Sequence, residues 1–279
     1  MKPMSDTLQT LSPPKPRTYG AVNWVGLWTL YKREVGRFLK VWMQTLFAPV
    51  VTTLLFMTVF KLAFGNRGEL TGDFAGLNYN DFLAPGLVVM SVLQNAFQNS
   101  SSSLTIAKVQ GSQVDFLMPP LSSAELAFGF IFGAVTRGIM VGVISAIAIH
   151  FSGLADLSVA HWGPIIYFAL MAAIFLAALG AMGGIWADKF DHLAAVTNFV
   201  IVPLTFLSGT FYDINVLVEP FQTLAHFDPI FFLIDGFRYG FTDAANSDLF
   251  LGATVSAGSA LVASVGVWWM LKSGYKLKA

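Results

Sequence analysis

Arg137 is a charged side chain about ten residues into an otherwise apolar segment, residues 127–151. A charge at that depth of a hydrophobic helix is costly and marks a candidate functional site by default. Two roles fit. The guanidinium can serve conformational coupling, held by helix carbonyls or by an acid such as Glu34, or it can contact a substrate directly. We favour coupling.

Polar side chains also recur every three or four residues in the segment 82–103: Ser91, Gln94, Asn95, Gln98 and Ser102. That spacing places them on one face of a helix. Such a stripe lines either a helix interface or a water-accessible cavity, and the sequence supports both equally. Gln94, Asn95 and Gln98 are therefore candidates for a polar path through the protein, together with the aromatic Phe206 and Phe211.

Several kinds of chemistry are excluded by composition and spacing. The chain has no cysteine, and its four histidines lie far apart without ligand spacing, so we expect no metal site. The acids cluster between the apolar segments, which leaves no constellation for an intramembrane enzyme. No G-x-x-x-x-G-K-[ST] loop occurs, so the chain cannot bind and hydrolyse ATP by that means. Sixteen Lys and Arg balance sixteen Asp and Glu, which argues against nucleic acid as a partner.

The elements that must position these residues are membrane helices. Of the 279 residues, 55% are hydrophobic and 11% charged, against roughly 25% charged in a soluble domain. A span needs about 20 apolar residues. We predict an all-α integral membrane protein whose membrane domain covers residues 21–279, behind a disordered cytoplasmic tail, residues 1–20. Its six predicted spans are 41–64, 82–103, 127–151, 162–187, 193–212 and 249–271.

Positive charge sets the predicted orientation. Most of the sixteen Lys and Arg fall on the side that holds both termini, whereas the acids gather on the other side. Cytoplasmic loops carry an excess of Lys and Arg. Both termini are therefore predicted to be cytoplasmic.

Residues 22–40, before the first span, are predicted to form an amphipathic elbow helix in the cytoplasmic interface. Its aromatic stripe includes Trp28, and Arg33 and Arg37 lie on the opposite face, toward water, with Glu34 between them. The helix either anchors the protein or also contacts a cytoplasmic partner, and we favour the contact.

The cytoplasmic loop 104–126 is longer than a turn between two helices requires. Residues 112–117 are predicted to form a short helix, which Pro119 and Pro120 stop. Phe116, Leu117 and Met118 are apolar and need a cover, either lipid or the groove of a partner protein, which we favour. The loop residues predicted to contact that partner are Lys108, Gln110, Gly111, Asp115, Phe116, Leu117, Met118 and Pro119.

Residues 213–248, on the outer side, are predicted to form a re-entrant pair of helices. Asp228 and Pro229 are a good N-cap and first residue for a helix over 229–242. That helix is about 21 Å long and cannot cross about 30 Å of hydrocarbon. Asp235 and Arg238 are spaced for an i, i+3 pair. Phe231, Phe232 and Phe237 are predicted to face the fifth span, of the same chain or of a second copy, near Phe206 and Phe211, and to close an outer gate.

These residues resemble a known family. The stretches are residues 204–212 (LTFLSGTFY), Asp228-Pro229, residues 235–240 (DGFRYG), residues 84–87 (APGL), Ala107-Lys108, the loop end at residues 117–120, and Thr136-Arg137-Gly138. They resemble the membrane subunit of ABC-2 type ABC transporters, most closely the small bacterial inner-membrane permeases that pair with a separate ATPase. Asp228 stands where the family usually has Asn, which keeps the N-cap.

The resemblance implies one elbow helix, six spans, a coupling helix in the 104–126 loop and outer re-entrant helices. It also implies an exporter in the bacterial inner membrane, surrounded by lipid, in which two copies of the permease work with two ATPase subunits that hold ATP and Mg. This chain would then need no cofactor, and its substrate would be amphipathic, lipid-linked or drug-like. The alternatives are a secondary transporter, which would want central carboxylates and internal repeats, and a non-enzymatic membrane protein without an ATPase.

Overall fold

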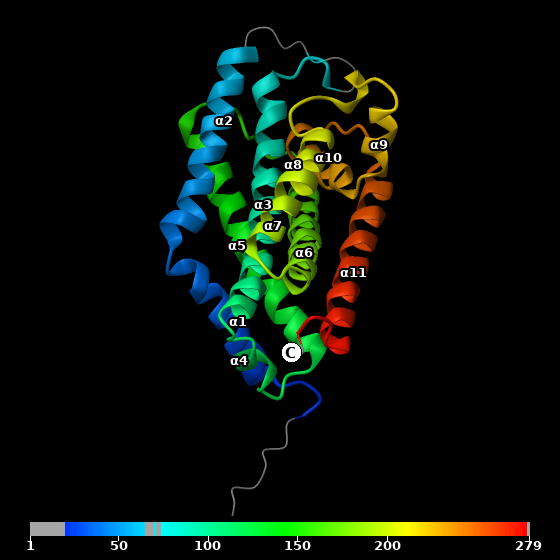
Figure 1. Ribbon diagram of the computed structural model, residues 1–279. Helices are drawn as coiled ribbons and strands as arrows, with labels where there is room; N and C mark the ends of the chain where they lie inside the picture. Colours follow the sequence, from blue (N-terminus) through cyan, green and yellow to red (C-terminus); the bar gives the residue numbers. More distant parts are fainter. Residues whose placement is uncertain (1–19, 65–69, 71–73, 278–279) are drawn as a thin grey trace, which may run out of the picture.

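The computed structural model describes residues 20–64, 70 and 74–277, and no strand occurs among them. The predicted tail, residues 1–20, lies almost wholly outside the described residues. Figure 1 shows an elongated helical bundle, with α4 and the C-terminus at one end and α9 and α10 toward the other. The α-helices are α1 (Trp24–Leu39), α2 (Ala48–Phe64), α3 (Tyr79–Val109), α4 (Val114–Leu117), α5 (Ser123–Ser152), α6 (Trp162–Trp186), α7 (Phe190–Val196), α8 (Val202–Leu207), α9 (Phe221–Phe227), α10 (Pro229–Thr242) and α11 (Leu249–Ser273).

Two short π-helical turns interrupt the first and fifth predicted spans. They are η1 (Met43–Phe47), which runs into α2, and η3 (Thr197–Ile201), which joins α7 to α8. Each ends two residues before a proline, Pro49 or Pro203. A proline ring clashes with the carbonyl four residues earlier, which here lies inside the π turn. Widening that turn is the way the helix accommodates its proline.

Five helical stretches of the described chain are long and apolar enough to cross a membrane: Met43–Phe64, α5, α6, Phe190–Leu207 and α11. The second predicted span, within α3, is not among them. α3 is 31 residues long, but its amides and serines lower its hydropathy. Most of its residues are buried inside the bundle, so protein surrounds most of its polar side chains. Its role as the sixth span stays a prediction.

The fifth predicted span, residues 193–212, ends early. Helix α8 stops at Leu207 and the chain turns at Gly209, whose φ of +75° favours glycine. The turn packs on α3, where a Cβ at Gly86 would lie 2.6 Å from the carbonyl oxygen of Thr210. Phe211 and Tyr212 therefore belong to the turn that follows α8 and not to that helix.

Glycines let α5 and α6 approach α3 closely. A Cβ at Gly138 would lie 2.9 Å from the carbonyl oxygen of Val92, and one at Gly184 would lie 2.7 Å from that of Ser101. At Gly180 a Cβ would press on the carbonyl of Phe97. These small residues therefore serve packing within the chain, with α3 as the central helix.

Candidate functional site

Arg137 of α5 is buried and points at the polar face of α3. Its Nη2 donates to Oδ1 of Asn95 at 2.9 Å and lies 3.5 Å from Oε1 of Gln98. The suggested acidic partner, Glu34, is instead paired with Arg37. The polar stripe of α3 faces α5, and its amides therefore accept from Arg137. The apolar pattern of α5 alone does not show which helix packs against it.

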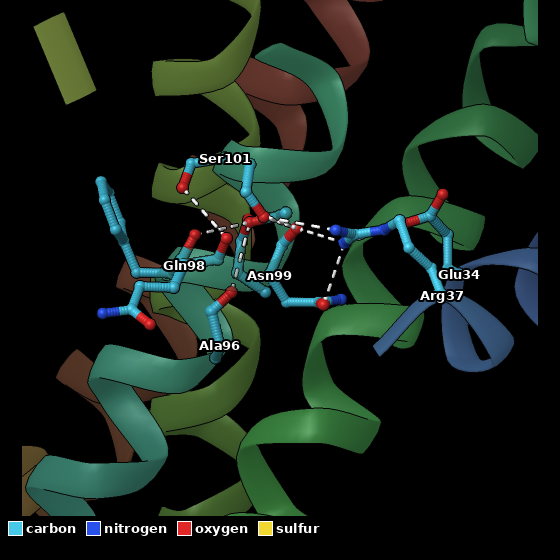
Figure 2. A network of polar contacts seen from close by, with 10 residues as sticks. Glu34, Arg37, Ala96, Gln98, Asn99 and Ser101 are labelled. Atoms are coloured by element: carbon cyan, nitrogen blue, oxygen red, sulfur yellow. Dashed lines mark hydrogen bonds and ion pairs between the residues drawn. The ribbon is translucent and has the colours of Figure 1, made fainter. Parts of the chain in front are cut away.

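Arg37 of α1 reaches the same face of α3 a turn farther along (Figure 2). Its Nη2 donates to the carbonyl oxygen of Asn99 at 2.8 Å and to Oδ1 of Asn99 at 3.0 Å, and it lies 3.4 Å from Oε2 of Glu34. Its Nη1 lies 3.4 Å from Oγ of Ser102. Asn99 was missed in the sequence, although it follows Asn95 by four residues and continues the stripe.

The predicted orientation of the elbow helix is wrong in part. Arg37 was expected to face water with Arg33, but its side chain is only 28% exposed. The buried stripe of α1 is Leu27, Leu30, Glu34 and Phe38. A Cβ at Gly133 of α5 would lie 2.6 Å from Cβ of Glu34, so this glycine makes room for the acid. Trp28 lies beside that stripe and stays exposed, as does Arg33.

The polar network, defined as Glu34, Arg37, Asn95, Gln98, Asn99 and Arg137, joins α1 and α5 to α3. The network holds two guanidinium groups and one carboxylate, which pairs with Arg37. Arg137 has only amide acceptors, and Arg37 also donates to Asn99. Gln98 is exposed at the surface of the chain, and Figure 2 shows its amide on the side of α3 away from Arg37. An exposed amide in the middle of a membrane bundle faces water or another protein surface more readily than lipid.

The other two path candidates lie elsewhere. Phe211 stacks on Phe60 of α2 at 4.9 Å between ring centroids and meets Phe206 edge-on at the same distance. Its carbonyl oxygen accepts from the Tyr79 hydroxyl at 2.8 Å. Tyr79 begins α3, so this aromatic cluster is roughly 22 Å along that helix from Gln94. The structure does not bring the amides and these aromatics together.

Residues 213–248 contain the predicted helix, and α10 runs from Pro229 to Thr242. Asp228 caps it, accepting from the Ile230 backbone N–H at 2.9 Å, and also accepts from the Ser208 hydroxyl at 2.7 Å. Phe231 and Phe232 are buried in a cluster with Ile214 and Ala225. Within one chain these rings therefore do not pack on Phe206 and Phe211, and their contact with the fifth span of a second copy stays a prediction.

The predicted pair of Asp235 with Arg238 is also wrong. Oδ2 of Asp235 accepts from the backbone N–H and the hydroxyl of Ser247, at 2.9 and 2.7 Å. Arg238 is fully buried and donates to the carbonyl oxygens of Phe82, at 3.1 Å, and Gly209, at 2.7 Å. Its guanidinium carbon lies 3.8 Å from the centre of the Phe82 ring. Arg238 thus joins α10 to α3 and to the turn after α8.

The coupling loop contains the short helix α4, within the predicted range 112–117. Phe116 does not need an external cover, because it is buried edge-on against Phe130 of α5 with 5.2 Å between ring centroids. Leu117 and Met118 are exposed, at 41% and 79%. Other exposed residues of this loop are Gln110, Gly111, Asp115 and Pro119.

Lys108, also predicted to contact a partner, is engaged inside the chain. Its Nζ donates to the carbonyl oxygens of Ile185 and Ala187, at 2.9 and 2.8 Å, at the end of α6. It also pairs with Asp188 at 3.1 Å, and Lys276 pairs with the other oxygen of Asp188 at 2.9 Å. Hydrogen bonds from Lys276 and Lys108 lower the pKa of the Asp188 carboxyl below its usual value. This cluster ties the ends of α3 and α6 to the C-terminal turn.

The elbow helix and the coupling loop are joined directly. The Asn23 backbone N–H donates to Oε1 of Glu125, whose other oxygen accepts from the Ser122 N–H in a capping box at the start of α5. The Asn23 side chain donates to the carbonyl oxygen of Pro120 at 3.2 Å. A displacement of the loop would therefore reach α1 and, through Arg37, the polar network.

Five stretches long and apolar enough to cross a membrane, with no strand among the described residues, define a multi-pass helical membrane protein. Residues 25–242 match the family model of the ABC-2 type transporter. The chain is 37% identical over 220 residues to the inner membrane transport permease YadH of Escherichia coli K12, an alignment covering 78% of this chain and 83% of that protein. It is 26% identical over 221 residues to nodulation protein J of Rhizobium leguminosarum bv. trifolii, covering 78% and 81%.

The chain therefore belongs to the ABC-2 type transporter family and is a membrane subunit of a transporter in the inner membrane. The Escherichia coli relative is named a transport permease. Membership in this family implies pairing with an ABC ATPase subunit.

Proposed function

We propose that this chain is the permease of an ATP-driven exporter. Two copies form the translocation path, and a separate ABC ATPase, present twice, binds ATP and Mg and drives transport. The substrate is amphipathic, lipid-linked or drug-like, and both termini are cytoplasmic. In support, the C-terminus and α4 lie at the same end of the bundle, opposite the outer segment (Figure 1).

One observation supports the proposal that the 104–126 loop couples this chain to an ATPase. Leu117 and Met118 are exposed apolar side chains at the tip of a loop whose neighbour, Phe116, is fixed in the bundle core. A rigidly anchored apolar tip is suited to entering a groove of a partner and transmitting its movement. The hydrogen bond between Asn23 and Glu125 connects the loop to α1, so a displacement of the loop would also displace Arg37.

The same reasoning supports a path between two copies. Gln98 is exposed while its hydrogen-bond neighbour Arg137 is buried, so the network opens on the surface of the single chain. A second copy over that surface would enclose a polar path. An outer gate would then be stabilised by the buried rings of Phe231 and Phe232. Arg238 would stabilise it as well, because it joins α10 to α3 and to the turn after α8.

The coupling proposal is tested by the double variant Leu117→Asp/Met118→Asp. We expect the variant to insert normally and to lose an ABC ATPase that copurifies with the native permease. Phe116 is left unchanged because a charge at a buried position would unfold the loop. The matched control is Val216→Asp/Val218→Asp, an exposed apolar pair at the outer end, which should keep the ATPase. Retention of the ATPase with unchanged coupled transport in the loop variant would refute the proposal.

A further inference from the structure

The outward face of α1 carries a cationic groove, of which the proposed transport cycle uses only Arg37. The groove has a volume of about 530 Å³ and is lined by Thr29, Lys32, Arg33, Gly36, Arg37 and Lys40. All six residues belong to α1 or to its C-cap, so the groove is an open face of one helix. Gly36 forms its floor, since a Cβ there would meet no atom within 4 Å.

Three of the four cations that line this groove have no ion-pair partner within the described chain. No ion pair among the described residues involves Lys32, Arg33 or Lys40. The single acid on α1, Glu34, lies on the buried face and bonds Arg37. Four cations around a glycine floor make a site for an anion of the size and charge of a phosphate ester.

The position of the groove identifies the source of that anion. Figure 1 shows α1 rising along the outside of the bundle toward the start of the first span, so Lys40 lies where the chain enters the membrane. The exposed Trp24 and Trp28 on the same helix are typical of headgroup depth. The cytoplasmic leaflet of a membrane is anionic.

We propose that the groove binds the phosphate headgroup of an anionic phospholipid of the cytoplasmic leaflet. The assignment rests on the orientation in the proposed function, but not on the ATPase. Arg37 lines the groove and also donates to Asn99, so the lipid is in contact with a residue of the polar network. The groove is thereby a place where membrane composition acts on transport.

The test is lipid binding to the purified permease alone, by native mass spectrometry with phosphatidylglycerol and phosphatidylcholine. The native chain should prefer phosphatidylglycerol. Arg33→Gln/Lys40→Gln should weaken that binding about 30-fold at low salt, from about 1 kcal/mol for each cation. The matched control, Lys189→Gln/Lys272→Gln, removes two exposed cations elsewhere and should change it little. Equal losses in both variants would mean diffuse attraction and overturn the site.

Shape is tested separately from charge. Gly36→Leu fills the floor without changing charge and should also weaken phosphatidylglycerol binding at least severalfold, whereas Gly258→Leu, at another open glycine, should not. Native affinity in Gly36→Leu overturns the proposal. So does displacement of the lipid by an equal concentration of inorganic phosphate, which would assign the groove to a free anion. Loss of the ATPase from Arg33→Gln/Lys40→Gln with lipid binding intact would assign it to an acidic protein surface instead.

Discussion

The bond between Arg137 and Asn95 is the most direct test of the buried network. Asn95→Leu removes the 2.9 Å acceptor and leaves Arg137 only the longer contact to Gln98. A hydrogen bond to a charged group contributes about 1.5–3 kcal/mol. Neutral bonds between membrane helices average about 0.6 kcal/mol. Because Arg137 is buried and charged, we expect the larger value.

A double-mutant cycle measures this coupling. Arg137→Met removes the charge, and Asn95 keeps its own bond to the Ser91 carbonyl oxygen at 3.0 Å. The double variant replaces the pair by apolar side chains and should be less destabilised than the sum of the single variants by about 1.5–3 kcal/mol. The free energy of unfolding is followed by tryptophan fluorescence during titration with sodium dodecyl sulfate in mixed micelles.

The matched control is Gln94→Leu, which removes the adjacent amide. Gln94 is not among the hydrogen-bond partners of Arg137. Gln94→Leu and Arg137→Met should therefore add within about 0.5 kcal/mol. A coupling below about 0.5 kcal/mol between Asn95 and Arg137 would refute the assignment of the amide as the partner of this charge.

Three further expectations follow from packing, charge and topology. Gly180→Ala should destabilise the bundle by about 1–3 kcal/mol, because the added Cβ would press on the backbone of α3. The control is Gly163→Ala, which places its Cβ in open space and should not destabilise the bundle. Equal free energies of unfolding for the two variants would contradict this packing. Hydrogen bonds from Lys276 and Lys108 lower the pKa of the Asp188 carboxyl, so the stabilisation is present above the ordinary value of about 3.9 and is lost as pH falls through the lower folded pKa. The protection factors of the C-terminal turn, which are corrected for the intrinsic exchange rate at each pH, should therefore be equal at pH 7 and pH 5. Lower protection factors at pH 5 would contradict this expectation. The chain has no native cysteine, so Val218→Cys should react with an impermeant thiol reagent from outside and Met118→Cys from the cytoplasm, and the reverse pattern would invert the topology.

Local signals predicted the elements well. Asp228 and Pro229 specify where α10 begins, since an N-cap and a first-turn proline act within a few residues of the chain. Composition and the lengths of the apolar stretches likewise predicted the spans that became α5, α6 and α11. The prolines at 49 and 203 were visible too, although the π turns they cause were not predicted.

Partners of the charged side chains were predicted poorly. Asp235 and Arg238 are one turn apart, but carbonyls of Phe82 and Gly209 compete for the guanidinium and are closer in the fold. Spacing along a helix shows which side chains are neighbours on that helix, but not what another helix presents to them. Phe116 was taken as exposed for the same reason, because its cover, Phe130, comes from the far side of the loop.

The sequence by itself determined that this chain is a multi-pass helical membrane protein, with a polar stripe on one helix, a charge in another and a family resemblance that the comparisons confirmed. Only the tertiary structure decided that α3 is the centre, that Arg37 and Arg137 converge on its face, and that Arg37 turns inward from the elbow helix. The physical reason is the distance along the chain over which each effect acts. Hydropathy and capping act within one turn or one span, whereas the partner of a buried charge is chosen by whichever helix packs against it, and here glycines such as Gly133 and Gly138 bring those helices within reach.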